Sequence, residues 1–154
     1  MTKILIRKAQ LSDLSSIKKL VTKLVDSLAN TKDIDSNQVA NNLKTLFKDL
    51  NSYIFVAEIK GTITGFINFT IRKTISHRGL SGLIDELVVS KKFQGKGIGN
   101  QLVLTAIKKC RQLGCCEVEV STEKTNIKAR DFYKKCGFEE RGLLFELDLY
   151  IIDR

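Results

Sequence analysis

The chain lacks several features that would divide it or anchor it. Its 154 residues include no proline, and no low-complexity tract or internal repeat marks a linker, so residues 1–154 are predicted to form a single domain. No run of about 18 apolar residues occurs, which excludes a membrane-spanning helix as an expectation. The first residues, Met1–Arg7, alternate like a strand and lack the apolar core of a signal peptide, so we expect a cytoplasmic protein.

Histidine and cysteine are too few and too scattered to indicate metal or thiol chemistry. The only histidine is His77, and the four cysteines form no paired C-x-x-C element, so no metal site is predicted. Cys110 and Cys136 fall on the apolar side of predicted helices, where a free thiol usually packs as a small core residue. A catalytic cysteine would need a nearby base, which His77 in its basic, turn-like stretch is poorly placed to supply.

Positive charge is in excess, with 26 Lys+Arg against 17 Asp+Glu and a formal net charge of +9. Such an excess first suggests a nucleic-acid partner. The basic residues are spread over most of the chain, however, and aromatic residues that could stack on bases make up only 7% of it. The sequence therefore favours a solvated lysine-rich surface over a nucleic-acid interface, and the same charge would attract a small anionic ligand such as a phosphate.

The hydrophobic pattern predicts an α/β fold. Alternating or β-rich runs predict strands at residues 3–8, 53–59, 62–71, 82–90, 117–121 and 143–152. Apolar stripes of helical spacing predict helices at residues 14–28, 36–50, 97–113 and 126–136. The resulting order is strand, two helices, three strands, helix, strand, helix, strand, with helices covering both faces of the sheet.

The most specific segment is Gln94-Gly95-Lys96-Gly97-Ile98-Gly99, between a predicted strand and a predicted helix. This arrangement places free backbone N–H groups at the positive end of a helix dipole, where a phosphate binds well. The glycines could instead serve only a tight turn. The segment is not a dinucleotide fingerprint, because Asn100 replaces the third glycine, and no Gly-Lys-Ser/Thr follows to bind a magnesium nucleotide.

A second segment indicates a family. It contains Asn126, Ala129, Phe132, Tyr133, Gly137 and Phe138. Together with Gln94-x-x-Gly97-x-Gly99, it resembles the GNAT superfamily of acetyl-CoA-dependent N-acetyltransferases, closely over residues 82–149 and in outline over residues 1–81. The resemblance implies the GNAT fold, a central mixed, mostly antiparallel sheet with splayed central strands. It also implies direct transfer of an acetyl group to an amine in a ternary complex.

The resemblance implies a place for each part of acetyl-CoA. The pantetheine arm would bond to the main chain of the central strand, and the pyrophosphate would lie on the loop amides. The residues so assigned are Leu87, Val88, Val89, Gln94, Gly95, Lys96, Gly97, Ile98, Gly99, Asn100, Asn126 and Tyr133. The side chains of Leu87 and Val89 could equally pack in the core, and Lys96 could be an ordinary solvated lysine.

Two catalytic roles follow from the same resemblance. Tyr133 matches the tyrosine that protonates the departing thiolate, although its spacing alone would also fit a core aromatic residue. A carboxylate should remove the proton of the acceptor amine, and Glu86 is the first candidate, with Asp85 and Glu119 as alternatives. Adjacent strand residues point to opposite faces, so at most one of Asp85 and Glu86 is expected to face the acceptor. The backbone N–H of Val89 would meet the oxyanion.

Other functions remain open from the sequence. A non-catalytic acyl-CoA-binding sensor would keep the same loop, and a basic nucleic-acid-binding protein would use the net charge. The acceptor could be a small amine, a free amino acid or a protein amine. Self-association into a homodimer is also left open.

Overall fold

The chain divides into two compact units, residues 1–120 and 121–154, and the computed structural model describes residues 3–25 and 35–149 of them. The first unit contains β1 (Leu5–Lys8), the 3-10 turn η1 (Leu11–Asp13), α1 (Leu14–Val25), α2 (Ser36–Lys48), β2 (Ser52–Ile59), β3 (Thr62–Arg72), β4 (Leu80–Val89), the 3-10 turn η2 (Lys91–Phe93), α3 (Ile98–Gln112) and β5 (Cys115–Val120). The second unit contains α4 (Ile127–Lys135). The predicted element order is confirmed from β1 to α4, and none of the described helices is long and apolar enough to cross a membrane.

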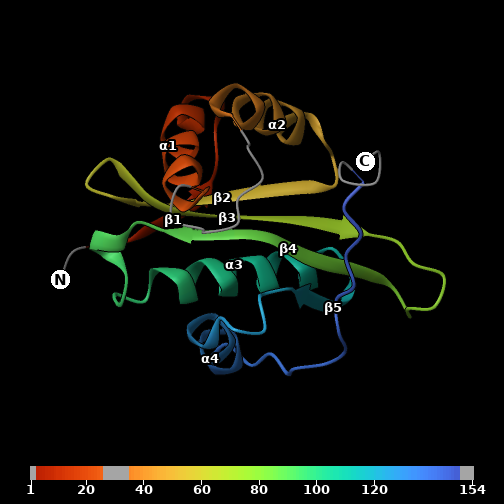
Figure 1. Ribbon diagram of the computed structural model, residues 1–154. Coiled ribbons are helices and arrows are strands. Elements are labelled where there is room, and N and C mark those ends of the chain that lie inside the picture. The colour runs from red at the N-terminus through yellow and green to blue at the C-terminus, as the bar shows by residue number, and fades with distance from the viewer. Residues whose placement is uncertain (1–2, 26–34, 150–154) are drawn as a thin grey trace. The chain divides into compact units, whose positions relative to one another are not determined.

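Within the described residues, the first unit is built on a five-stranded sheet in the order β1-β2-β3-β4-β5 (Figure 1). The pairs from β1 to β4 are antiparallel, whereas β4 and β5 are parallel because α3 carries the chain back to the other end of the sheet. Lys60 and Gly61 join β2 to β3 with positive φ at both positions, as a tight hairpin requires. The predicted mixed, mostly antiparallel sheet is confirmed.

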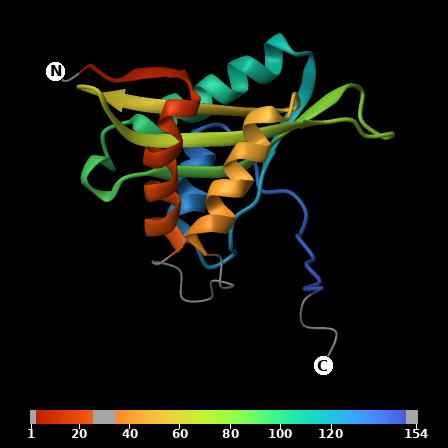
Figure 2. The same cartoon turned by 90° about the horizontal axis from the view of Figure 1, so that it is seen from above.

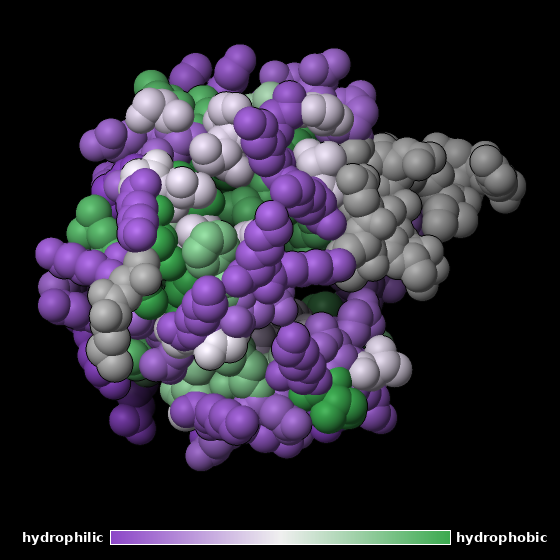
Figure 3. Space-filling model, turned by 90° about the vertical axis from the view of Figure 1, so that its left-hand side faces the viewer, coloured by the Kyte–Doolittle hydropathy of each residue, from purple (hydrophilic) through white to green (hydrophobic). Residues whose placement is uncertain are grey.

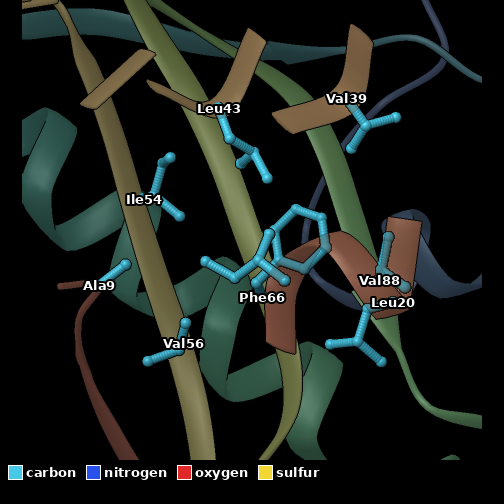
Figure 4. Close-up of a cluster of buried hydrophobic side chains, with 9 residues drawn as sticks. Ala9, Leu20, Val39, Leu43, Ile54, Val56, Phe66 and Val88 are labelled. Carbon is cyan, nitrogen blue, oxygen red and sulfur yellow. The ribbon is translucent and has the colours of Figure 1, made fainter. Parts of the chain in front are cut away.

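Helices α1 and α2 lie side by side on one face of this sheet (Figures 1 and 2). Their apolar stripes meet the alternate side chains of β2, β3 and β4 that point the same way. The buried cluster comprises Ala9, Ile17, Leu20, Val39, Leu43, Ile54, Val56, Phe66 and Val88 (Figure 4). Full burial of one such large side chain contributes about 1.5–3 kcal/mol. The helix predicted to reach Leu28 is confirmed as far as Val25, and residues 26–34 lie outside the described residues.

Helix α3 covers the opposite face, as predicted (Figure 1). It packs closely on β4 at Gly82, where a Cβ atom would lie only 2.6 Å from the sulfur of Cys110. Cys110 is 1% exposed, and burial raises the pKa of its thiol to about 12. The expected packing role of Cys110 is confirmed, whereas Cys136 is only half-buried. All four cysteines carry free thiols.

The second unit differs from the prediction after α4. A strand was predicted at residues 143–152, but Leu143–Leu149 forms no strand, and residues 150–152 lie outside the described residues. The large apolar side chains of this segment are exposed, namely Leu143, Leu144, Phe145, Leu147 and Leu149. Apolar, β-prone residues become a strand only when a neighbouring strand pairs with them. No described strand pairs with residues 143–149, so the prediction is wrong for this segment.

Candidate active site

A β-bulge in β4 places two carboxylates on one face of the sheet. The register between β3 and β4 shifts between Asn68 and Phe69, which leaves Asp85 without a partner. Asp85 accepts a hydrogen bond from Thr70, and Glu86 accepts one from Asn68. Asn68 and Thr70 are two residues apart on β3 and therefore share a face. The prediction that Asp85 and Glu86 point to opposite faces is wrong, because strict alternation fails at the bulge.

Glu86 is the first of the three candidates for the general base. It lies on the face covered by α1 and α2, two residues from Val88 of the buried cluster. Among the described residues, neither Glu86 nor Asp85 forms an ion pair. Partial desolvation by the surrounding protein raises the pKa of Glu86 above its usual value. The hydrogen bond from Asn68 lowers this pKa, and the charge of Asp85 raises it further. A raised pKa makes the carboxylate a stronger proton acceptor near neutral pH.

The two central strands separate beyond Ile84. The parallel ladder joins Leu80–Ile84 of β4 to β5 and stops there, while β4 continues to Val89. From Glu86 onward, β4 therefore pairs with β3 on one side and with no described strand on the other. The predicted splay is confirmed, and it leaves main-chain groups of Leu87–Val89 facing an open edge. The side chain of Val88 packs in the core, and along an antiparallel pair only alternate residues direct their main-chain groups away from the partner strand.

The glycine loop turns the chain from β4 into α3. Gly95 and Gly97 adopt φ of 76° and 79°, and a Cβ on either would meet no atom within 4 Å. Gly97 is the N-cap of α3, and the first N–H groups of a helix have no intrahelical partner. Gln94 ties the loop to the end of β4, since its Nε2 donates to the Val89 carbonyl oxygen at 3.0 Å. The loop thus combines positive φ with open space on the side a Cβ would occupy.

Gly99 and Lys96 of the same loop differ from Gly95 and Gly97 in their surroundings. Gly99 lies inside the first turn of α3 and has no positive φ, so the turn itself does not require glycine there. The Lys96 ammonium lies 5.1 Å from the centre of the Phe93 ring, a cation–π distance. Figure 3 shows the side of the molecule at which α3 begins, where hydrophilic residues surround and interrupt an area of hydrophobic ones.

Glu119, the third candidate for the base, already has a cationic partner. The Arg72 guanidinium forms an ion pair with its carboxylate, and the adjacent acidic residue Glu117 lies 3.0 Å from His77 Nδ1. An acceptor amine would have to compete with this guanidinium for the Glu119 carboxylate. Glu119 is therefore less suited to act as the base than Glu86.

In the second unit, Asn126 and Gly137 mark the two ends of α4. Asn126 is the N-cap, and its side chain accepts a hydrogen bond from Ala129 N at 3.0 Å. At the other end Gly137 has φ of 93°. Gly137 N donates to Lys134 O and Phe138 N to Tyr133 O, both at 3.0 Å, which is a Schellman motif. Sequence analysis missed these caps, although Asn at the start and Gly after the end of a helix are the usual signals.

Tyr133 is held on α4 by two neighbouring aromatic rings. Its ring lies 5.1 Å from that of Phe132 and 5.6 Å from that of Phe138, in edge-on geometry both times. Burial raises the pKa of its phenol to about 12. The hydroxyl is therefore protonated throughout the neutral range and can serve as a proton donor.

The family model and the similar proteins of known sequence all indicate the same family. The sequence model described as the Acetyltransferase (GNAT) family matches residues 18–138. The glucosamine 6-phosphate N-acetyltransferase of Schizosaccharomyces pombe is 35% identical over 62% of this chain and 88% of its own. The aminoalkylphosphonate N-acetyltransferase of Salmonella typhimurium is 30% identical over 91% of this chain and 88% of its own.

Solved structures show the same fold at lower identity. An aminoglycoside N-acetyltransferase in complex with CoA superimposes with a TM-score of 0.85 at 18% identity, over 97% of both chains. The glucosamine-6-phosphate N-acetyltransferase of Arabidopsis thaliana gives a TM-score of 0.77 at 23% identity, over 96% of this chain and 99% of that one. These likenesses extend over nearly the whole chain.

Proposed function

The chain belongs to the acetyltransferase (GNAT) family and is an acetyl-CoA-dependent N-acetyltransferase, and we propose that Glu86 is its general base and Tyr133 its general acid. Glu86 accepts a proton from the acceptor amine, whose nitrogen attacks the thioester carbonyl. The tetrahedral intermediate collapses to the N-acetyl product, and the departing thiolate takes a proton from Tyr133. No covalent enzyme intermediate is formed. The observation that carries the proposal is the exposed Asp85–Glu86 pair, without a cationic partner among the described residues, beside the open edge of β4.

The geometry of the first unit supports the proposed cofactor residues. The open edge at Leu87–Val89 offers main-chain groups to the pantetheine arm, and the N–H of Val89 is proposed as the oxyanion donor. The loop from Gln94 to Asn100 offers the first amides of α3 to the pyrophosphate. Lys96 adds positive charge beside them. Asn126 is also proposed to bind the pantetheine or the loop around it, and its amide nitrogen would make this contact because its oxygen caps α4.

The acceptor is proposed to be a small primary amine. This class is supported by the two relatives named above, which act on an amino-sugar phosphate and on aminoalkylphosphonates. We further propose that residues 1–154 form one domain, because the family match crosses the boundary between the two units. A cytoplasmic location is proposed from the free thiols. The scattered basic residues support the proposal that no nucleic acid is bound.

Acetyl-CoA is expected to raise the thermal midpoint, because a ligand that binds only the folded state stabilises it by about 2.7 kcal/mol at a hundredfold excess over its Kd. NAD and ATP should give smaller shifts in the same thermal-shift measurement. Release of free thiol with a panel of amines then tests turnover. Stabilisation by acetyl-CoA without thiol release from any amine would favour the sensor, and stabilisation by NAD alone would contradict the cofactor assignment.

Replacing Gly97 with Val is expected to weaken acetyl-CoA binding, since the branched side chain would enter the open space above the loop and strain a backbone at φ of 79°. Gly61→Val is the matched control, because Gly61 has φ of 75° and equally open surroundings in the β2–β3 turn. Both variants should lose similar stability. Only Gly97→Val should lose affinity in isothermal titration calorimetry, and equal affinities in the two folded variants would limit Gly97 to a role in the turn.

A further inference from the structure

A buried carboxamide lies directly behind the proposed base. Asn68 is in the middle of β3, opposite Glu86 in the register and next to the bulge. It is only 3% exposed, and its neighbours on the same face are the core side chains Ile54 and Phe66. Asparagine has low strand propensity, and burying its amide costs free energy unless both polar ends are hydrogen-bonded. An aliphatic side chain would pack better at this position, so packing does not explain why residue 68 is an asparagine.

Both polar ends of the Asn68 amide are hydrogen-bonded, and the two bonds form a chain that runs from Ser52 through Asn68 to Glu86. Ser52 Oγ of β2 donates to Asn68 Oδ1 at 3.1 Å. Asn68 Nδ2 donates to Glu86 Oε2 at 2.7 Å. Because Ser52 occupies the oxygen, the amide presents its N–H group to the carboxylate. Hydrogen bonds in such a chain strengthen one another, and the last of them, to an ionised acceptor, is of the stronger kind.

The chain of hydrogen bonds leaves one oxygen of the carboxylate free. Among the described residues, Glu86 Oε2 alone accepts a hydrogen bond from protein, so Oε1 is available to an acceptor amine or to a water molecule. Asp85 on the same face has its own donor, Thr70. The two carboxylates are therefore held separately by two residues of β3, although they are adjacent in β4.

We infer that Asn68, oriented by Ser52, is a positioning residue that fixes the orientation of the Glu86 carboxylate and keeps it ionised for proton abstraction. The inference rests on the proposed role of Glu86 as the base. Asn68 does not touch the reacting atoms in this scheme. It acts by directing Oε2 toward β3 and Oε1 toward the acceptor.

The test is the pH dependence of kcat/KM for acetyl transfer in the full chain. Asn68→Leu removes the donor, so the protonated form of Glu86 gains relative to the ionised form, and the acidic limb should move to higher pH. Ser52→Ala should move the limb in the same direction by a smaller amount, and Ser52→Thr, which retains a hydroxyl, should restore the wild-type profile. The KM for acetyl-CoA should stay within about twofold, because no cofactor contact is changed.

Thr64→Val is the matched control for structural damage. Thr64 is also buried in β3, and its hydroxyl donates to the Ala57 carbonyl oxygen at 3.1 Å, not to a catalytic group. This variant should lose some stability and keep the wild-type pH profile. Should Asn68→Leu fail to fold, Ser52→Ala at a half-buried position supplies the same readout.

The outcomes separate this inference from the proposed function. Wild-type pH profiles in both Asn68→Leu and Ser52→Ala, together with an inactive Glu86→Gln, would overturn the positioning role alone. An active Glu86→Gln would overturn the base assignment, and the positioning role with it. A shift in Thr64→Val equal to that in Asn68→Leu would reduce the effect to general loosening of β3, which also contradicts the inference.

Discussion

Glu86→Gln is expected to lower kcat/KM for the amine acceptor by about 10²–10⁴ at neutral pH, because it removes the group that accepts the amine proton. The acidic limb of the pH profile should disappear with it. Acetyl-CoA affinity should be unchanged, since the cofactor is proposed to bind main-chain groups further along β4. The thermal midpoint at neutral pH should not fall. The pKa of Glu86 is raised in the folded state, so its ionised form opposes folding above the unfolded-state pKa, and neutral Gln removes that cost.

Asp85→Asn is the matched control for this substitution. Asp85 lies beside Glu86 on the same face, and its charge raises the pKa of Glu86. Removing that charge should retain turnover and move the acidic limb to lower pH. Steady-state kinetics between about pH 5 and pH 9 would show both effects. Loss of turnover in Asp85→Asn, with wild-type rates in Glu86→Gln, would exchange the roles of the two carboxylates.

Tyr133→Phe is expected to reduce kcat by about 10- to 10⁴-fold when protonation of the departing thiolate limits the rate. The substitution removes only the hydroxyl and keeps the ring, which packs edge-on against Phe132 and Phe138. Stability and acetyl-CoA affinity should therefore change little. The rate is measured by thiol release at saturating acetyl-CoA over a range of pH.

Phe132→Tyr is a useful companion, because it places a hydroxyl on the neighbouring ring of the same helix. It should not rescue Tyr133→Phe in the double variant, since adjacent helix positions point in different directions. Turnover by Tyr133→Phe equal to that of the wild type at every pH would remove Tyr133 from the mechanism. Water or the ammonium proton of the acceptor would then protonate the thiolate.

Much of the fold could be predicted from local sequence. The 3.6-residue stripes of α1, α2 and α3 and the hairpin at Lys60-Gly61 depend on side-chain order and backbone preference, so the residues of each element are enough to predict it. The glycine loop was predicted for the same reason, because positive φ at Gly95 and Gly97 is a property of single residues. The strand predicted at residues 143–152 failed over Leu143–Leu149, because a strand also needs a neighbour with which to pair.

The local sequence determined the helices and strands, the glycine loop and the carboxylates that are candidates for the base, since each depends on residues close together in the chain. Only the tertiary structure decided how those carboxylates are arranged. The bulge at Asp85 is a feature of the pairing between β3 and β4, and it brings Asp85 and Glu86 to one face against the rule of alternation. Pairing also places Asn68 behind Glu86, 18 residues away in the chain. No short segment determines the hydrogen-bond register between strands that are far apart in the sequence. The surroundings of the proposed base are therefore decided only by the folded sheet.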